Sequence, residues 1–363
     1  MSRIEVKKRR ALLSRKEWLT IAASFVITVL AGVLSAFHAN AVFIFVVAGG
    51  ALALLAALVG QATEQIGARL GSGATGVLQS ALGNLPELFV GIFALRAGLI
   101  SVVQAALVGS ILGNSLFVLG LAFFVGGLRN GVQRFASDAP RMTATLTMLA
   151  VAALAVPTLV HGLHTPAAGH EEGFSVASAV ILLVVFVASI PGSLQGGPPA
   201  PPEGRTVSLH SWPIWLAVVV LLGAGVGAAL VSDWFVAALT PAITFLHISP
   251  AFTGFVIVAL AGNAVENVVG IQFAARNQAD YSISVILNSS LQVALGLIPV
   301  LVLLSFIIGG AHLTLVMPPL LVAALGITAI INTFIIYDGE STWLEGLVLV
   351  GLYGIIAVSF WWG

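Results

Sequence analysis

The stretch Gly83-Asn84-Leu85-Pro86-Glu87 recurs 179 residues further along the chain as Gly262-Asn263-Ala264-Val265-Glu266. Gly, Asn and Glu stand in register in the two copies, and the same shift extends the match into the sequence that follows. Apolar residues match one another easily by chance, whereas these small and polar residues do not, so the match indicates an internal repeat. Further residues paired by this shift are Val90 with Val269, Gly91 with Gly270, Ile92 with Ile271, Ser110 with Ser289 and Leu112 with Leu291.

The chain around these two copies is strongly apolar. Of its 363 residues, 59% are hydrophobic and only 8% are charged, against roughly 25% charged residues in soluble domains. Apolar runs of about twenty residues, long enough to cross a hydrocarbon core, recur along nearly the whole length. The absence of cysteine excludes disulfides, thiolate metal ligands and cysteine catalysis. The composition therefore predicts an integral membrane protein.

The apolar runs predict an all-α protein with about eleven transmembrane helices. Helices are favoured over a β-barrel because runs such as residues 180–190 lack the alternation of barrel strands. Residues 233–247 either extend the seventh span or form a short interfacial helix. The predicted spans are residues 17–37, 41–68, 74–98, 100–127, 141–161, 174–193, 211–232, 251–276, 281–308, 313–336 and 341–362.

Lys and Arg residues predict the orientation, because they accumulate in cytoplasmic loops. Seven of the fourteen lie in the N-terminal tail, and six more fall at cytoplasmic span ends if that tail is cytoplasmic. Only Arg96 falls on the outer side. The N-terminus is therefore expected in the cytoplasm and the C-terminus outside. A signal peptide is the alternative for the first span, with Ala39-Asn40-Ala41 as its cleavage site, although the apolar region is longer than usual.

The two copies of the repeat lie on the third and eighth predicted spans. Because an odd number of spans separates them, they cross the membrane in opposite directions. Inverted repeats are typical of secondary transporters, which bind their substrate near the membrane midplane where the repeats meet. Gly83, Pro86 and Gly262 would weaken the helices there and free backbone carbonyls as ligands.

Glu87 and Glu266 are the candidate ligands at that midplane. An ionised carboxylate in an apolar helix requires a partner or a water-filled cavity, and no Lys or Arg lies in the middle of a span to pair with it. One such Glu could simply hydrogen-bond to a neighbouring helix, but two at equivalent positions favour an external cation. Oxygen ligands without Cys or His suit Ca²⁺ better than Mg²⁺ or a softer metal. The neutral candidate ligands are Asn84, Asn263, Ser110, Asn114, Ser289 and Gln292.

The paired carboxylates also predict coupling to protons. Two nearby carboxylates in a low dielectric favour binding a proton when no metal is present, so Ca²⁺ and protons compete for the same oxygens. With alternating access, this competition suffices for a cation/proton antiporter that carries Ca²⁺ as substrate and needs no cofactor. A cation channel is the alternative class, but channels usually build a pore from several subunits. An enzyme is not expected, because the His-Glu-x-x-His and Gly-x-Ser-x-Gly motifs are missing.

These motifs resemble those of the Ca²⁺/cation antiporter superfamily, and most closely its Ca²⁺/H⁺ exchanger branch. Each Gly-Asn-x-x-Glu copy is followed by a second polar motif, Gly109-Ser110-Ile111-Leu112-Gly113-Asn114 or Asn288-Ser289-Ser290-Leu291-Gln292. Sodium/calcium exchangers usually carry Ser or Thr at the Asn positions, which favours the proton-coupled branch. The segments implied by the resemblance are a basic tail with one extra helix (residues 1–40), two five-helix repeats (41–193 and 211–363) and a Pro/Gly-rich cytoplasmic connector (194–210).

By this resemblance Glu87 and Glu266 bind Ca²⁺ and protons in turn, and the six neutral residues flank them. Thr63-Glu64 resembles a Thr-Glu pair of the family, so Glu64 is expected to line the cytoplasmic route and take part in proton coupling. The connector lacks the acidic regulatory helix of many relatives, and a Na⁺(K⁺)/H⁺ or Na⁺/Ca²⁺ exchanger remains the alternative. The positions that depart from the branch are Pro86, Asn267 and Asn288.

The resemblance further implies a location in the cytoplasmic (inner) membrane of a bacterium or archaeon. The expected partners are Ca²⁺, H⁺ and the lipid bilayer, with a homo-oligomer left open and no nucleic acid. An outer loop could also sense a divalent ion or protons, although a solvated loop without a function is the simpler interpretation. The residues of that loop are His161, His164, His170, Glu171 and Glu172.

Overall fold

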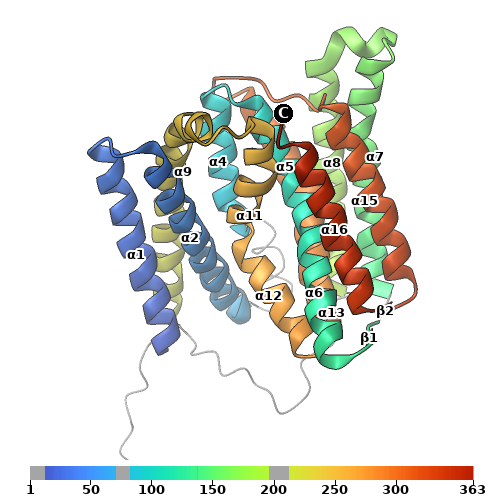
Figure 1. Ribbon diagram of the computed structural model, residues 1–363, viewed down its shortest axis with the longest axis horizontal. Coiled ribbons are helices and arrows are strands. Elements are labelled where there is room, and N and C mark those ends of the chain that lie inside the picture. The colour runs from blue at the N-terminus through green and yellow to red at the C-terminus, as the bar shows by residue number, and fades with distance from the viewer. Residues whose placement is uncertain (1–12, 71–81, 137, 196–211, 363) are drawn as a thin grey trace, which may run out of the picture.

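The computed structural model describes residues 13–70, 82–136, 138–195 and 212–362. The described residues form a bundle of long helices, as the apolar runs predict (Figure 1). Helices α1 (Arg15–Ala36), α2 (Ala41–Leu70) and α9 (Ile214–Leu246) pack together at one side of the bundle. The other helices form the larger remainder, so the expected all-α class is confirmed for the described residues.

Several helices of the larger part are interrupted by short π-helical turns, which are written η1, η3 and η4. Two strands of two residues each pair antiparallel at one end of the bundle, with Gln133 opposite Ser341. The elements of this part are α4 (Leu85–Arg96), α5 (Ile100–Leu112), η1 (Gly113–Val118), α6 (Leu119–Asn130), β1 (Gln133–Arg134), α7 (Asp138–Gly162), the 3₁₀ helix η2 (Pro166–His170), α8 (Glu171–Gln195), α10 (Pro250–Phe252), η3 (Thr253–Val258), α11 (Ala259–Gly262), α12 (Ala264–Ala275), α13 (Ala279–Gln292), η4 (Val293–Leu297), α14 (Ile298–Ser305), α15 (Pro319–Tyr337), β2 (Glu340–Ser341) and α16 (Trp343–Ser359).

Eight helical stretches among the described residues are long and apolar enough to cross a membrane. A ninth candidate is bent, because its parts Pro250–Gly262 and Asn267–Ala275 meet at 64°. Helix α16 is apolar but shorter. The predicted third span, residues 74–98, falls partly outside the described residues, so the total of eleven spans stays a prediction.

Helix α9 is longer than the predicted seventh span. It continues to Leu246, so residues 233–246 extend that span and do not form a separate interfacial helix. The extension packs inward, and the ring of Phe235 stacks on Phe45 of α2 with centroids 4.7 Å apart. This contact packs the part of α9 that follows Asp233 against α2.

Helix boundaries recur at the interval of the sequence repeat. Helices α4 and α12 begin at residues 85 and 264 and end at 96 and 275, so both boundaries differ by 179. Helices α5 and α13 begin at 100 and 279, and α6 and α14 begin at 119 and 298, again 179 apart. A π-helical turn precedes both α6 and α14. Such turns often occur at functional sites within helices.

Glycines allow α5 and η3 to approach within backbone contact. A β-carbon at Gly109 of α5 would lie 2.2 Å from the carbonyl oxygen of Phe255 in η3. In the other direction, a β-carbon at Gly254 would lie 2.4 Å from the carbonyl oxygen of Val102. Small residues at membrane helix contacts permit this close packing. The contact brings the polar motif Gly109–Asn114 against the helical segment that leads into Asn263.

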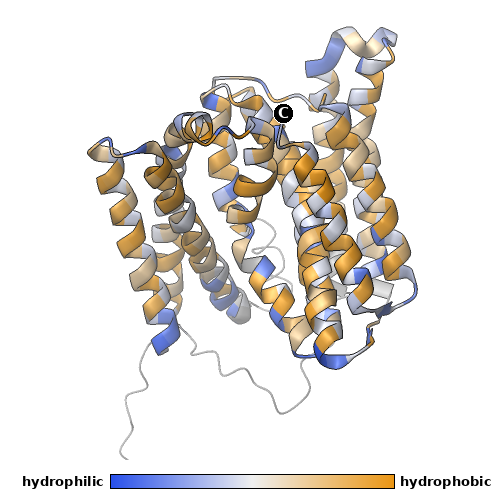
Figure 2. Cartoon of the chain, viewed as in Figure 1, coloured by the Kyte–Doolittle hydropathy of each residue, from blue (hydrophilic) through white to orange (hydrophobic). Residues whose placement is uncertain are grey.

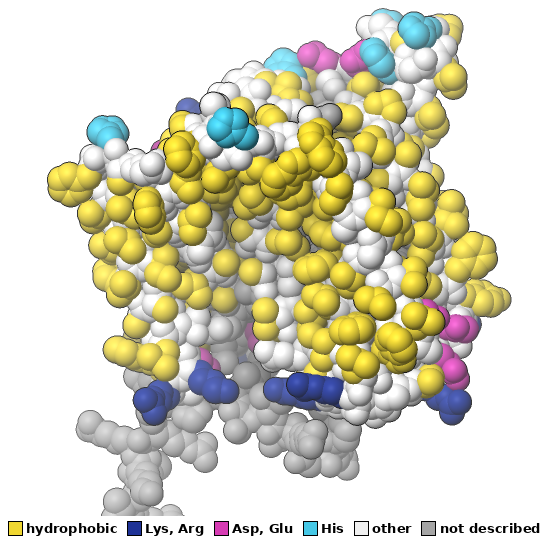
Figure 3. All heavy atoms as spheres, in the orientation of Figure 1, with side chains coloured by type: hydrophobic (Ala, Val, Ile, Leu, Met, Phe, Trp, Pro, Cys, Tyr) yellow, Lys and Arg dark blue, Asp and Glu magenta, His cyan; other side chains and the backbone are white. Residues whose placement is uncertain are grey.

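The surface divides into an apolar belt and two charged ends. Hydrophobic residues predominate along the helices (Figure 2), and large apolar side chains such as Phe25 and Phe334 are exposed. Lys and Arg side chains gather at the end where α1 begins, whereas His side chains gather at the opposite end (Figure 3). This distribution matches the one expected of a membrane protein with one cytoplasmic end.

Candidate functional site

Both Gly-Asn-x-x-Glu segments place their asparagine, in a non-helical conformation, directly before a helix. Helix α11 ends at Gly262 and α12 begins at Ala264, with Asn263 between them at φ −94° and ψ 16°. Asn84 has nearly the same conformation, φ −93° and ψ 20°, directly before α4. These angles fall in the sparsely populated bridge region, where many active-site residues are found. The predicted weakening of the helix at Gly262 is therefore confirmed.

Glu87 lies in the first turn of α4. Backbone N–H groups in the first turn of a helix have no partner within that helix, and the positive end of the helix dipole lies there. Pro86 occupies the second helical position, where its missing N–H costs no hydrogen bond. The helix start thus provides a favourable electrostatic environment for a carboxylate within an apolar region.

The two segments contact each other through Glu87 and Gly262. A β-carbon at position 262 would lie 2.7 Å from Cγ of Glu87 and 2.9 Å from its Oε1. Only glycine therefore leaves room for the Glu87 side chain in this position. The contact joins segments 175 residues apart in sequence, and it fixes where the carboxylate of the first segment lies relative to the break in the second.

Asn263 is the centre of a buried cluster of neutral polar side chains. Its side chain is only 2% exposed. The amide nitrogen donates to Ser110 Oγ of α5 at 2.5 Å and to the carbonyl oxygen of Ala259 at 3.0 Å. Its Oδ1 accepts hydrogen bonds from two further predicted ligands, which are Ser289 Oγ at 3.3 Å and Asn114 Nδ2 at 3.4 Å.

Asn114 and Ser289 complete this cluster. Asn114 Nδ2, on the π-helical turn η1, donates to Ser289 Oγ of α13 at 2.9 Å. The structure therefore brings together Asn263, Ser110, Asn114 and Ser289, four of the predicted neutral ligands, from separate elements. The cluster is asymmetric, because the shift of 179 that pairs Ser110 with Ser289 places Val293 at the position equivalent to Asn114.

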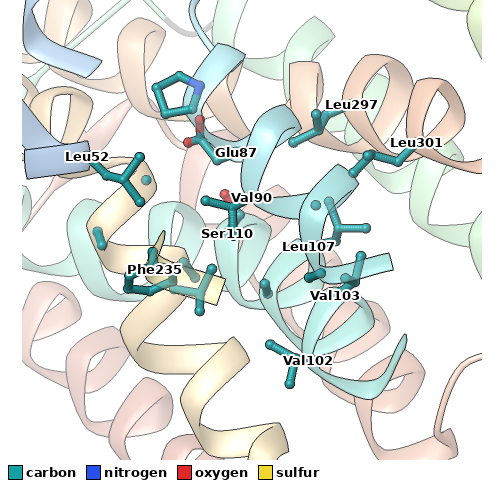
Figure 4. A pocket seen from close by; sticks show the side chains of 18 residues that line it. Leu52, Glu87, Val90, Val102, Val103, Leu107, Ser110, Phe235, Leu297 and Leu301 are labelled. Atoms are coloured by element: carbon teal, nitrogen blue, oxygen red, sulfur yellow. The ribbon is translucent and has the colours of Figure 1, made fainter. Parts of the chain in front are cut away.

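A cavity extends from this site along α4 and α5. Glu87 and Ser110 line it near the site, and Val102 and Val103 line its far part, near the turn between α4 and α5 (Figure 4). Its empty volume is about 580 Å³, including the part open to solvent. Apart from Glu87 and Ser110, every side chain that lines it is apolar or absent. An ion in this cavity would find its oxygen ligands at the Glu87 end.

The remaining predicted residues are placed as follows. Asn84 precedes α4, and its side chain caps none of the free N–H groups of that helix. Gln292 is the last residue of α13, about one turn beyond Ser289. Glu266 lies on α12, but its side chain is outside the part of the chain that the structure describes. Glu64 is exposed near the C-terminal end of α2, and that end of the helix lies at the end of the bundle where α1 begins (Figure 1).

One polar contact beside the cluster was missed from the sequence. The hydroxyl groups of Ser115 and Ser290 lie 2.9 Å apart and join η1 to α13. Each of these residues follows a predicted ligand directly, Asn114 or Ser289. Two serines buried in apolar helices were a detectable signal, but a serine in a helix often bonds only its own backbone.

The loop between α7 and α8 takes part in two separate His–Glu contacts. His161 Nδ1 lies 2.5 Å from Glu171 Oε1, and His312 Nδ1 lies 3.0 Å from Glu172 Oε1. Within the described residues, no three His, Cys, Asp or Glu side chains are grouped as a metal site would require. The loop therefore ties neighbouring helices together, and a role in sensing ions stays a hypothesis.

The comparison of the whole sequence with protein families agrees with this geometry. The profile of the family described as sodium/calcium exchanger protein matches residues 40–194 and 216–362. The chain belongs to the sodium/calcium exchanger family. The matched ranges include both Gly-Asn-x-x-Glu segments and all the residues of the Asn263 cluster, so the resemblance inferred from the motifs is confirmed.

Within this family the chain is similar to proton-coupled members. A Ca²⁺/H⁺ antiporter of Synechocystis is 37% identical over 339 residues, which cover 87% of this chain and 90% of the relative. The Ca²⁺/H⁺ antiporter ChaA of Bacillus subtilis is 32% identical, with 90% and 94% covered. The structure of native YfkE is 29% identical with a TM-score of 0.79, and 95% of this chain and 99% of that chain are covered. An H⁺/Ca²⁺ exchanger CAX, 18% identical, shares the fold with a TM-score of 0.73, covering 95% and 92%.

Proposed function

We propose that the chain exchanges Ca²⁺ for H⁺ across a membrane by alternating access. The observation that carries this proposal is the contact between the two Gly-Asn-x-x-Glu segments, where Glu87 lies against Gly262 beside the Asn263 cluster. Membership of the exchanger family, and the activity named for the similar antiporters, support Ca²⁺ and H⁺ as the two substrates.

In the proposed cycle the carboxylates of Glu87 and Glu266 bind either Ca²⁺ or protons. Ca²⁺ takes six to eight oxygen ligands, which two carboxylates can provide together with amide and hydroxyl oxygens of the cluster. The free N–H groups at the start of α4 favour the ionised form of Glu87, whereas the apolar cavity wall favours its neutral form. Because these influences oppose each other, a modest change in the Ca²⁺ or proton concentration is enough to exchange bound Ca²⁺ for protons.

The proposed architecture is an extra first helix followed by two inverted five-helix repeats, eleven spans in all. The recurrence of helix boundaries at an interval of 179 supports the repeat. The gathering of Lys and Arg at the end where α1 begins supports a cytoplasmic N-terminus. Glu64, exposed near that end, then lines the cytoplasmic route and takes part in proton coupling.

Proton flux in vesicles tests the proposed exchange. The purified protein is reconstituted with an acidic interior and a pH-sensitive dye, and Ca²⁺ is added outside in the absence of Na⁺ and K⁺. We expect Ca²⁺ to dissipate the gradient. Glu87→Gln and Glu266→Gln should each slow this flux by at least about tenfold, since bonds to a charged ligand contribute more than 1.4 kcal/mol.

Glu340→Gln is the matched control for this experiment. Glu340 of strand β2 pairs with Arg134 of strand β1 at one end of the bundle, and its loss should leave the flux unchanged. A gradient that responds to Na⁺ or K⁺ but not to Ca²⁺ would assign the chain to a different exchange reaction of the family. Full activity of Glu87→Gln would mean that the cation binds elsewhere.

A further inference from the structure

A second cavity lies between α7, α15 and the junction of α5 with η1 and α13. Its lining shares no residue with the cavity at Glu87. The apolar part of its wall includes Ile111, Val151 and Leu325. Four neutral polar residues also line it, and no charged residue does so among those described. These four are Ser115, Thr147, Thr328 and Asn332.

Two of the four polar groups are buried without a protein partner. Asn332 is 5% exposed and Thr328 is 2% exposed. Neither Asn332 Oδ1 nor Thr328 Oγ1 has a hydrogen-bond partner among the described residues. The two residues are four positions apart on α15, so both side chains lie on the same face of that helix. Leaving such groups unpaired is costly, so their shared position on the cavity wall indicates a bound hydrogen-bonding ligand.

The other two polar residues face this cavity from different elements. The Thr147 hydroxyl on α7 donates to the carbonyl oxygen of Thr143 at 2.9 Å, and its oxygen keeps lone pairs that can accept a bond. Ser115 shares a hydrogen bond with Ser290 and keeps capacity for another partner. Buried cavities hold water where two to four polar partners converge, and here four residues do so.

We propose that this cavity is a hydration site, in which an ordered water molecule bridges Thr328 and Asn332 of α15 to Thr147 of α7 and Ser115 of η1. Water fits better than a metal ion, because a buried cation without a counter-charge is strongly unfavourable. The water links helices α7 and α15 to Ser115 of η1. Ser115 in turn shares its hydrogen bond with Ser290 of α13. Since Asn114 and Ser289 are the neighbouring residues in sequence, the water helps to position two ligands of the Asn263 cluster.

The direction of the stability change distinguishes a hydrated cavity from a dry one. Thr328→Val and Asn332→Leu remove one polar group each while nearly keeping the side-chain shape. In a hydrated cavity each variant lowers the melting temperature of the full-length protein in detergent, because the water loses a partner. The fall in melting temperature of the double variant is then smaller than the sum of the falls of the two single variants, because both groups bind the same water. In a dry cavity each variant removes an unpaired group and raises the melting temperature.

An unchanged or raised melting temperature in the single variants, or strictly additive losses, would therefore overturn the proposal. Thr333→Val is the matched control on α15, because the Thr333 hydroxyl bonds the carbonyl oxygen of Ala329 and does not line the cavity. The melting temperature is also compared in NaCl or KCl and in choline chloride at equal ionic strength. If NaCl or KCl raises it, and Asn332→Leu abolishes that rise, the cavity binds a monovalent cation and the proposal is overturned.

Radiolytic hydroxyl labelling of the unaltered protein gives a second measurement, which does not depend on how the variants fold. Water beside a buried side chain allows that side chain to be modified during a short X-ray pulse. We expect labelling of Leu325, which lines the cavity, and none of Leu239, which is also buried, on α9. Equal absence of label at both leucines would contradict a bound water.

Discussion

The three atoms nearest to a β-carbon at residue 262 would all belong to the side chain of Glu87, and none would be a backbone atom. The Glu87 side chain is flexible, so it can move aside, whereas the helix packing around it need not change. The position of the carboxylate is thus sensitive to a single methyl group. Sites that bind a small cation require their ligands within a few tenths of an ångström of the bonding distance.

Gly262→Ala should therefore impair transport without unfolding the protein. We expect Ca²⁺-dependent proton flux to fall by at least about tenfold, since a shift of one ligand is enough to lose a tenfold factor in binding. The melting temperature in detergent should change by less than about 2 °C, within the usual effect of a tolerated substitution. Gly351→Ala is the control, because a β-carbon there meets nothing within 4 Å. Unimpaired flux in Gly262→Ala would show that the contact has no part in transport.

Individual polar residues were predictable, but their partners were not. Asn263, Ser110, Asn114 and Ser289 were identifiable because polar groups in apolar helices require an explanation. Which of them bond to one another depends on helix rotation and on the π-helical turn η1, and neither can be read from residue types. The contact between Ser115 and Ser290 was missed for the same reason. The side chain of Glu266 lies outside the described residues, so its role stays a prediction.

At the scale of elements, the contact between α5 and η3 decides how closely the helices around Ser110 and Asn263 approach each other. Gly109 and Gly254 place one backbone directly on the other. This contact carries Ser110, one residue beyond Gly109, to the amide of Asn263. The sequence predicted both helices and the glycines, but a glycine alone does not say which surface it faces. The extra length of α9 was likewise open, because it depends on the stacking of Phe235 on Phe45.

Gly109→Ala should destabilise the protein through this contact. The new β-carbon would meet backbone atoms of Phe255, at 2.2 Å from O and 2.7 Å from Cα, so the helices must separate. Overpacking of this kind costs about 1–3 kcal/mol, which corresponds to a fall of roughly 1–4 °C in melting temperature for a chain of this length. Thermal unfolding in detergent measures it.

Gly326→Ala is the control for that substitution, because its β-carbon would meet nothing within 4 Å. Alanine is the better helix former by about 0.5–1 kcal/mol, so this variant should be as stable as the parent or slightly more so. Equal melting temperatures for Gly109→Ala and the parent protein would mean that α5 and η3 can part without loss, and that their contact is not needed for stability.

At the scale of the whole molecule, the two ends differ in charge type. Lys and Arg gather at the end of the bundle that carries strand β1, and His residues gather at the opposite end, which carries η2 (Figure 3). The sequence predicted this division through the alternation of spans, without knowing how the helices pack. The orientation in the membrane follows from it only by the tendency of Lys and Arg to remain in the cytoplasm.

Single cysteines can test this orientation directly, because the chain contains none of its own. Ala136 lies beside β1 and His170 is the last residue of η2, and both positions are exposed. Each is replaced by cysteine in turn. A thiol reagent that cannot cross the membrane should label His170→Cys in intact cells and Ala136→Cys only after the membrane is opened. The reverse pattern would place the N-terminus outside.

Asn114 has one further consequence for the whole molecule. Its amide bonds both Asn263 and Ser289, whereas Val293 occupies the equivalent position in the second repeat. If the repeats exchange conformations during the cycle, this amide serves one access state and has no substitute in the other. Ca²⁺ gradients of equal size and opposite direction would then drive exchange at unequal initial rates. Measurements on right-side-out and inside-out vesicles can compare these rates. The molecule would act as a kinetic rectifier for Ca²⁺ while leaving the final equilibrium untouched.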